Sequence, residues 1–524
     1  MKTISRLAAA LTILIYCVPA VAADVPNAAT SNDTPAASQD AAREKSRLIN
    51  AETLFMNRSL DSAVRELKDI IKDYPDTDTA AEAYWWLAKC HELSGSYAEA
   101  LAELSAGLAT NAGPDVAAKL LFEEAACRME PANPERDLGR AIDVFKKVVA
   151  LYPQSPKAAG AAYYAAVCLL GRGEYKTAAD ALLAFADGHP ESGYASAALY
   201  KRGLALCFDG RRDEALAVFR SVRDRYPDGL YATQAQDAAE LVLRAAGKRP
   251  PAFSSAYGAR GEGPDRSGRL SGAASDPEGV LYVADAGNGR IRRFKTDNAG
   301  IVSGISGAVP PGSDRRALAG PSAVALGPSG KIYAADRVAG RVAAYSQDGR
   351  VTGSLAPAGR TRFNSPSGVA VDESGMVYVS DEVAGLVYVF GPDGRQARSF
   401  GQGEGRLRSP AGIAAGPRGT LLVTDGVAGR LIEYDPSGRV LKSFTAKGDY
   451  RLSEPSGVCV DAVGNVYVSD KARRSVIVFD SDLEPLCEVS GKSGAELGGP
   501  AGLAVVGTAI FVTDPVTDRI VVLK

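Results

Sequence analysis

The sequence predicts two repeat modules, an all-α solenoid followed by an all-β six-bladed propeller. Helical periodicity with a repeat near 37 residues covers 41–246, and short strand patterns with a repeat in the mid-forties cover 252–524. A hinge at 247–251, which contains Gly and Pro, separates them. A chain of 524 residues is also too long for a single hydrophobic core.

The first 23 residues have the features of a cleaved secretory signal. Lys2 and Arg6 precede an apolar stretch, and Ala20-Val21-Ala22 offers a small-residue cleavage site. No stretch approaches the roughly 20 apolar residues of a membrane-spanning helix, so we expect no transmembrane segment. Cys17 follows Tyr16, where lipoprotein signals carry a small residue, which disfavours lipidation. We therefore expect a periplasmic protein, with secretion as the alternative.

Residues 24–40 lack apolar periodicity and are rich in small polar residues, which predicts a disordered leader. The solenoid of 41–246 should contain five helix pairs and a capping helix from about 230 to 246. Its third pair carries an insertion at 130–134. Proline cannot extend a helix, so each Tyr-Pro or His-Pro step marks the end of a pair. These steps occur at Pro75, Pro153, Pro190 and Pro227.

Two segments resemble the tetratricopeptide repeat (TPR) family: Gly203-Leu-Ala-Leu-Cys-Phe-Asp-Gly210-Arg-Arg-Asp-Glu-Ala215 and Gly173-Glu-Tyr175-Lys-Thr-Ala178. Gly203, Ala215 and Ala178 fall where paired helices approach closely. The Tyr-Pro boundaries are similar to those of periplasmic TPR proteins associated with the Tol–Pal envelope system and outer-membrane assembly.

The TPR resemblance implies a partner-binding groove. It places aromatic residues at one equivalent position that faces the groove in the family, with Lys89 as a polar companion one helical turn after the first of them. Packing between helices is the other interpretation of these aromatics, and both remain open. The residues are Trp85, Phe122, Tyr163 and Tyr200.

A second repeat begins after the hinge. Gly375-Met-Val-Tyr-Val-Ser-Asp381 recurs in six copies, whose aspartates are 51, 45, 44, 45 and 44 residues apart. Four strands per period of this length predict a propeller blade. This repeated sequence resembles the NHL repeat family over about 270 residues. The six aspartates are Asp285, Asp336, Asp381, Asp425, Asp470 and Asp514.

The ends of the propeller predict how its ring closes. The last repeat stops at its third strand, at 520–524, whereas Phe253-Ser-Ser-Ala-Tyr257-Gly258 matches the fourth strand of another repeat, Ala397-Arg-Ser-Phe400-Gly401. We therefore predict that the strand at 253–258 completes the last blade, which removes two open sheet edges.

The repeated aspartates predict a structural motif. Each ends a second strand, where its carboxylate accepts backbone N–H groups of a turn. An arginine follows five residues later in four blades and should pair with it, whereas Leu386 and Ser475 take this place in the other two. We also expect these arginines on the face that binds a partner, together with Ser322, Ser367 and Ser456. The four are Arg290, Arg341, Arg430 and Arg519.

Composition excludes several activities. The net charge of −2 gives no field that would attract nucleic acid. Both histidines, His91 and His189, lie before the propeller, and no metal-binding or haem spacing occurs, so we expect no metal, no cofactor and no catalytic residue. The six cysteines that remain after the signal are scattered, which predicts unpaired packing residues.

These observations predict a non-enzymatic scaffold that binds other envelope proteins or peptides through its groove and one propeller face. Two alternatives remain. One is a propeller hydrolase or lyase acting on an envelope carbohydrate or lactone, which carboxylates in the channel would favour. The other is glycan binding, which exposed aromatic rings around one mouth would favour.

Overall fold

The computed structural model describes residues 36–247, 251–258, 268–297, 300–309, 318–328, 330–403, 405–416, 419–490 and 496–524. The predicted signal, the leader up to residue 35 and three hinge residues lie outside these ranges. Contacts divide the described chain into two compact units that meet between Arg202 and Gly203. Within the ranges described, no helix has the length and apolar character needed to cross a membrane.

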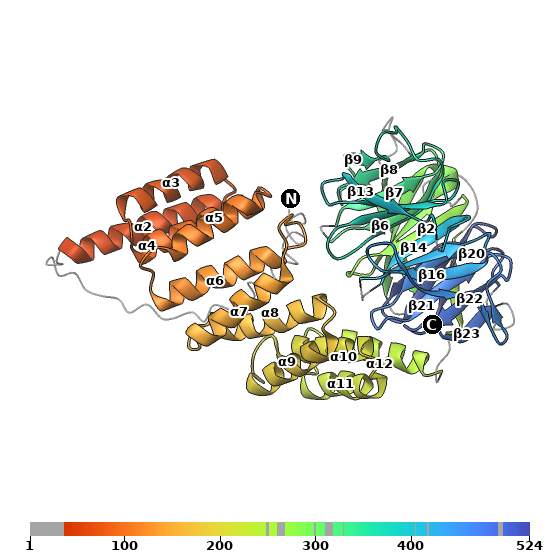
Figure 1. The fold of residues 1–524 in the computed structure, drawn as a ribbon, viewed down its shortest axis with the longest axis horizontal. Coiled ribbons are helices and arrows are strands. Elements are labelled where there is room, and N and C mark those ends of the chain that lie inside the picture. Colours follow the sequence, from red (N-terminus) through yellow and green to blue (C-terminus); the bar gives the residue numbers. More distant parts are fainter. Residues whose placement is uncertain are drawn as a thin grey trace. The chain divides into compact units, whose positions relative to one another are not determined.

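Eleven described helices precede the strands, as the sequence predicts (Figure 1). The first begins at Ala36, inside the segment predicted as a leader. The helices are α2 (Ala36–Met56), α3 (Leu60–Asp73), α4 (Asp78–Leu93), α5 (Tyr97–Leu108), α6 (Pro114–Met129), α7 (Leu138–Leu151), α8 (Lys157–Gly171), α9 (Tyr175–Gly188), α10 (Ala195–Phe208), α11 (Arg212–Arg225) and α12 (Ala232–Ala245).

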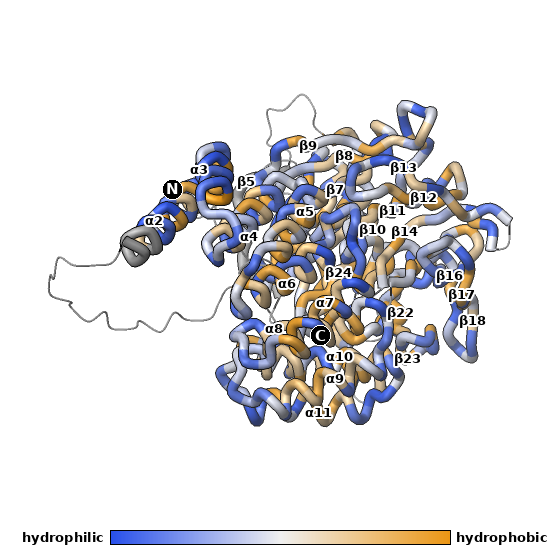
Figure 2. The backbone as a smooth tube through the Cα atoms, turned by 60° about the vertical axis from the view of Figure 1, so that its left-hand side comes forward, coloured by the Kyte–Doolittle hydropathy of each residue, from blue (hydrophilic) through white to orange (hydrophobic). Residues whose placement is uncertain are grey.

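The helix ends and crossings follow from the repeated residues. Helices α3, α7, α9 and α11 each end two residues before one of the four prolines. Gly203 allows α10 and α11 to pack closely, because a Cβ there would lie within 2.3 Å of the Phe219 ring. Ala178 and Ala215 are fully buried at the equivalent crossings. Hydrophobic and hydrophilic residues alternate along the elements (Figure 2), as expected for surfaces that bury one face.

The strands form six four-stranded antiparallel sheets, the blades of a propeller, and one short hairpin, β18–β19 (Ala446–Lys447 and Tyr450–Arg451). Blades one to three are β2 (Leu270–Ser275), β3 (Val280–Asp285), β4 (Arg290–Asp297) and β5 (Gly300–Val309); β6 (Pro321–Leu326), β7 (Ile332–Asp336), β8 (Arg341–Tyr345) and β9 (Val351–Leu355); and β10 (Pro366–Val371), β11 (Val377–Asp381), β12 (Leu386–Phe390) and β13 (Gln396–Phe400).

Blades four to six complete the ring. They are β14 (Pro410–Ala415), β15 (Leu421–Asp425), β16 (Arg430–Tyr434) and β17 (Val440–Phe444); β20 (Pro455–Val460), β21 (Val466–Asp470), β22 (Ser475–Phe479) and β23 (Pro485–Ser490); and β24 (Leu503–Val506), β25 (Ala509–Asp514) and β26 (Arg519–Leu523) with β1 (Phe253–Tyr257).

The predicted closure is confirmed. Strand β1 pairs antiparallel with β26, with Ala256 opposite Val521 and Tyr257 opposite Ile520. The sixth blade therefore combines the first strand of the domain with its last three. This pairing covers the hydrogen-bonding edge of β26, whose residues from Ile520 to Leu523 are buried.

Small residues let the innermost strands meet at the centre of the ring. A Cβ at Gly457 would lie 2.0 Å from the carbonyl oxygen of Ala501 in the next blade, and one at Gly412 would lie 2.3 Å from that of Ser456. Any larger residue would push adjacent blades apart. Apolar side chains of neighbouring blades fill the space farther out.

The last helices belong to the same compact unit as the propeller, so the division falls within α10 rather than at the predicted hinge. The buried Arg244 of α12 donates to the hydroxyl of Tyr467 at 3.1 Å and to the carbonyl oxygen of Thr508 at 2.9 Å. The side-chain amide of Asn465 donates to the carbonyl oxygen of Leu241 at 3.1 Å. These contacts join α12 to the fifth and sixth blades.

Candidate functional site

The six repeated aspartates organise one face of the propeller. We name the loops that lead into the innermost strands the entry loops, and those between the second and third strands the aspartate loops. Asp381 is fully buried and accepts the backbone N–H groups of Asn364 and Ser365 in the entry loop at 2.7 and 3.0 Å. It also accepts the N–H of Ala384 in the aspartate loop at 3.0 Å.

The same arrangement of buried carboxylate and loop N–H groups recurs in the other blades. Without these carboxylates the loop N–H groups would be buried without an acceptor. The aspartates therefore have the structural role that their repetition predicts.

Arginine pairing with the aspartates is confirmed in three blades. Arg290 lies 3.0 Å from Asp285, and Arg430 lies 3.2 Å from Asp425. The pair of Arg341 and Asp336 is looser, at 4.0 Å.

The fourth predicted pair does not form: Arg519 is exposed, and its guanidinium makes no ion pair with Asp514. Arg430 has a second role, because its guanidinium also donates to the carbonyl oxygen of Arg406 in the entry loop at 2.5 Å. Arg290, Arg341 and Arg430 therefore hold loops together rather than extending freely toward a partner.

The serines expected on this face join neighbouring blades. Ser322, Ser367 and Ser456 donate to the carbonyl oxygens of Pro366, Pro410 and Pro500, at 2.7, 2.6 and 3.0 Å. Each acceptor belongs to the following blade or to the segment that leads into it. These hydroxyl groups thus stabilise the ring, which explains their repetition without a ligand.

The central channel is lined by the innermost strands of all six blades and has a volume of about 360 Å³. Its wall consists mainly of Gly, Ala, Ser and Val, and Arg269, Arg337 and Lys471 stand at the mouth. The described lining contains no carboxylate, imidazole or thiol. In the described part of the chain, no cluster of three or more His, Cys, Asp or Glu side chains is arranged to hold a metal ion.

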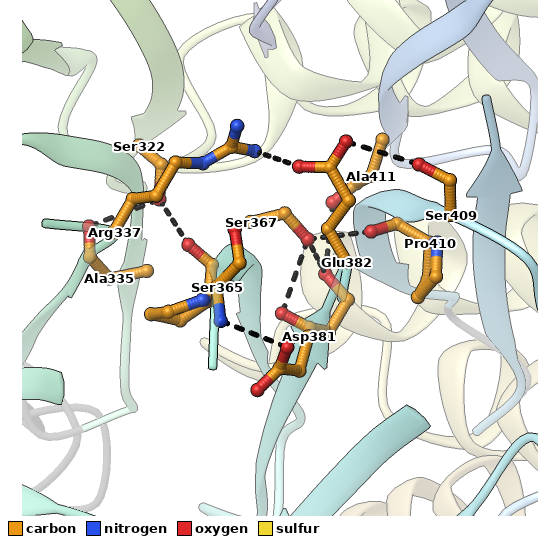
Figure 3. A network of polar contacts seen from close by, with 12 residues as sticks. Ser322, Ala335, Arg337, Ser365, Ser367, Asp381, Glu382, Ser409, Pro410 and Ala411 are labelled. Atoms are coloured by element: carbon orange, nitrogen blue, oxygen red, sulfur yellow. Dashed lines mark hydrogen bonds and ion pairs between the residues drawn. The ribbon is translucent and has the colours of Figure 1, made fainter. Parts of the chain in front are cut away.

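A polar network crosses three blades at the mouth (Figure 3). Arg337 of the second blade forms an ion pair of 2.7 Å with Glu382 of the third. Glu382 also accepts a hydrogen bond of 3.1 Å from the hydroxyl of Ser409, which precedes the fourth blade. The Glu382 carboxylate is therefore occupied by two partners from neighbouring blades.

A series of exposed valines on this face was not predicted from the sequence. They lie two residues after the blade aspartate in four blades and are 63–72% exposed. The signal was present as a recurrent Asp-x-Val, but it lay in loops that we treated as connections. The valines are Val338, Val383, Val427 and Val516.

A groove of about 790 Å³ lies between the third and fourth blades on the same face. Val383 and Val427 contribute to its walls, together with Arg406 and Arg408 of the entry loop. Both arginines are exposed. This groove combines aliphatic and cationic groups, whereas the central channel is mostly small and neutral.

The solenoid aromatics are largely enclosed by neighbouring helices. Trp85, Phe122 and Tyr163 are each only 4% exposed, and Tyr200 is half-buried. The Tyr163 ring stacks on Tyr194, with centroids 4.9 Å apart. A partner groove would need accessible rings, so the burial of the first three favours packing between helices.

Lysines cover two of these aromatic rings. Lys119 of α6 lies 4.0 Å from the centre of the Trp85 ring in α4, and Lys157 of α8 lies 5.2 Å from that of Phe122 in α6. Each lysine belongs to the repeat after the ring that it covers. The contacts therefore link successive repeats by cation–π attraction.

Lys89 belongs to a buried charged cluster. It lies 2.9 Å from Glu123 and 2.5 Å from Glu92, and Glu123 also accepts the indole N–H of Trp85 at 3.0 Å. Burial, together with the charge of Glu123, raises the pKa of Glu92 to about 7. These contacts occupy the Lys89 ammonium within the solenoid.

The six described cysteines are unpaired, and none is exposed. Burial raises the pKa of Cys90 and Cys487 to about 11 and that of Cys127 to about 12, which suppresses the reactive thiolate. We expect unreduced protein to show little alkylation when folded and six alkylated thiols after unfolding, as measured by mass spectrometry. A count of four or fewer would reveal a disulfide.

Comparison with family models matches tetratricopeptide repeats at residues 50–126, 135–193 and 197–229. Among curated proteins, no match to the chain was found. The NHL resemblance remains an inference from the repeated residues.

Solved structures similar to the chain include a gluconolactonase from Xanthomonas campestris, at 17% identity and a TM-score of 0.40, which covers 52% of this chain and 94% of that one. A virginiamycin B lyase from Staphylococcus aureus is 14% identical, with a TM-score of 0.37, and covers 49% of this chain and 80% of that one. These likenesses concern the fold and transfer no activity. The repeat matches and the six four-stranded sheets show that the chain joins an array of tetratricopeptide repeats to a six-bladed β-propeller.

Proposed function

We propose that the protein is an exported, non-enzymatic scaffold of the cell envelope, which binds protein partners through its TPR solenoid and one propeller face. TPR arrays are protein-interaction modules, and both modules of this chain expose large, rigid surfaces. Two binding surfaces on one chain would raise the effective concentration of one partner near the other without any new contact.

One observation carries the non-enzymatic part of the proposal. The channel of the propeller is lined by small side chains, and its serine hydroxyls donate to backbone carbonyls of adjacent blades. Hydrolysis or elimination needs a positioned base, nucleophile or metal, and the described lining supplies only Arg and Lys as ionisable groups. The aspartates closest to this face serve as acceptors for loop N–H groups.

Export rests on residues 1–23, with their basic start, apolar stretch and small-residue site. N-terminal sequencing of the mature protein from a Gram-negative host should find a start near Asp24 in the periplasmic fraction. A cytosolic protein that retains Met1 would contradict this part of the proposal.

The scaffold itself is tested with the full chain. Proteins captured from envelope extracts should bind again when both components are purified, at defined stoichiometry. The purified chain should also leave lactones and cyclic peptide esters unchanged. Steady turnover of such a substrate, or failure of every captured protein to bind in purified form, would overturn the proposal.

A further inference from the structure

Three consecutive entry loops carry an arginine at the same position. Arg362, Arg406 and Arg451 precede the third, fourth and fifth blades and are 44 and 45 residues apart. All three are exposed. Among the described residues, none of the three guanidinium groups forms an ion pair with a carboxylate.

A buried apolar residue fixes each arginine. Phe363, Leu407 and Leu452 follow the arginines directly and are 2–3% exposed. Their carbonyl oxygens contact Gly340, Gly385 and Gly429, each at the end of the aspartate loop of the preceding blade. The three arginines therefore occupy equivalent places on the propeller face because the residue after each is anchored between two blades.

Each anchored arginine is accompanied by an exposed valine. Val338, Val383 and Val427 stand two residues before the three glycines and are 71%, 72% and 70% exposed. The groove between the third and fourth blades shows the combination directly, because Val383, Val427, Arg406 and Arg408 all line it. An exposed aliphatic side chain beside an exposed cation thus recurs at three successive blade junctions. We name these six residues the valine–arginine arc.

The arc has a defined end. At the next junction the equivalent positions are Ala472 and Glu496, so both the aliphatic and the cationic group are lost. A pattern required only by the fold would continue around the ring, as the blade aspartates do. Val516 and Arg266 take the equivalent positions in the sequence at the junction of the sixth and first blades, beyond this interruption. The arc itself is an uninterrupted run of three junctions, which offers a continuous surface for an elongated ligand.

We propose that the valine–arginine arc binds an extended acidic segment of a partner protein, with carboxylates against the arginines and aliphatic side chains against the valines. This proposal rests on the scaffold function and names the chemistry of one partner. Charge complementarity decides the occupant, because three cations at regular spacing favour a ligand with regularly spaced anions. The exposed valines add apolar contact that a purely ionic ligand would leave unused.

The chemistry of the arc favours a polypeptide over a nucleic acid or a glycan. Single-stranded nucleic acids are held by aromatic stacking platforms, and the arc offers valine in their place. The exposed aromatic residues of the described chain, Phe253 and Tyr257, lie on β1 at the outer edge of the sixth blade. The valines of the arc are suited to contact the aliphatic side chains of a polypeptide.

The test uses the full chain and a fluorescently labelled peptide of repeated Glu-Val, with repeated Glu-Ser and Lys-Val peptides as controls. Fluorescence anisotropy should show binding of the Glu-Val peptide that weakens with added salt. The triple variant Arg362→Glu, Arg406→Glu, Arg451→Glu should bind it about tenfold more weakly or worse, from the loss of three charge contacts. The triple variant Val338→Ser, Val383→Ser, Val427→Ser should reduce the preference for Glu-Val over Glu-Ser.

A matched control variant changes the same net charge elsewhere. Arg350, Arg395 and Arg439 recur in blades two to four, in the turns between third and fourth strands, and are 77–90% exposed. Replacing all three with Glu should leave peptide affinity unchanged. Equal loss in this control, or equal binding of the Glu-Ser peptide by the wild type, would overturn the proposal.

Two further outcomes separate this proposal from the scaffold function. Displacement of the peptide by an oligouronate or an oligonucleotide at lower concentration would assign the arc to a different polymer. If the wild type does not bind the Glu-Val peptide and the arginine triple variant still captures its envelope proteins, the arc is the wrong surface and the scaffold proposal stands. If the wild-type chain captures no envelope proteins at all, the scaffold proposal itself is overturned.

Discussion

Replacing Arg244 with methionine should lower the unfolding free energy of the unit from Gly203 onward by about 3 kcal/mol. The guanidinium is buried and donates to the Tyr467 hydroxyl and to the Thr508 carbonyl oxygen, on two different blades. Methionine keeps the apolar stem but leaves both groups without this donor. Buried Asp461, which accepts from the same Tyr467 hydroxyl at 2.9 Å, would also lose a nearby positive charge.

The pH dependence of this loss has a defined sign. Burial raises the pKa of Asp461, and the charge of Arg244 opposes that rise. Removing the arginine should raise the pKa of Asp461 further. A carboxyl with a raised pKa in the folded state destabilises the fold as pH rises and the group ionises. The difference between variant and wild type should therefore increase with pH above the ordinary pKa of aspartate.

The measurement can separate the two units. Both tryptophans, Trp85 and Trp86, lie in the other unit, so their fluorescence reports unfolding there. Far-UV circular dichroism in the β-sheet region reports the propeller. The Arg244→Met variant should lower the propeller transition and leave the tryptophan transition in place.

Arg223 provides the matched control for this experiment, because it lies on α11 and is exposed. The variant Arg223→Met should change stability by less than about 0.5 kcal/mol. A propeller transition that is equal in the two variants would show that α12 does not stabilise the blades.

The repeat architecture was predictable because each of its sequence features recurs several times along the chain. Six aspartates at nearly constant spacing define the blades, and four prolines define the ends of helix pairs. Ring closure was predictable as well, since Phe253–Tyr257 matches an outer strand and the last repeat lacks one. Repetition averages out the ambiguity of any single short segment.

Features that occur once were not predictable in the same way. The contact of α12 with the blades depends on Arg244, one of 60 Lys and Arg residues, and nothing in its local sequence marks it as buried. The contacts group α12 with the blades in one compact unit, which the Gly and Pro residues of the predicted hinge do not indicate. The innermost strands of blades two to five each begin at a proline, whereas that of the sixth blade begins at Leu503, three residues after Pro500.

The candidate site shows a related limit. Equivalent positions identified the aromatics of the solenoid and the arginines of the blades, but equivalence does not distinguish a ligand contact from a repeated structural contact. Burial makes that distinction for Trp85, and pairing with a buried aspartate makes it for Arg430. The valine–arginine arc is repeated and exposed at once, and it became visible only when exposure was known.

Opening the ring should have the second large effect. The variant Tyr257→Pro places a proline opposite Ile520 in β1. Hydrogen-bonded pairs alternate along the ladder from Ala252 and Lys524, so the N–H of Tyr257 faces β26, and proline removes this donor and clashes with the ladder. Loss of β1 would uncover the edge of β26 and separate the two ends of the ring. We expect a loss of about 3 kcal/mol or more from the propeller transition, with self-association through the exposed strand.

Phe400→Pro is the matched control, because Phe400 occupies the equivalent position in β13, the outer strand of the third blade, opposite Val387. It should disturb one blade while the ring stays closed by β1 and β26. Circular dichroism melting and size-exclusion chromatography then separate the two effects. If both prolines lower the transition equally and both proteins stay monomeric, the β1–β26 pair contributes no more than any other outer strand. A larger shift with oligomers only for Tyr257→Pro would show that this one pair holds the propeller closed.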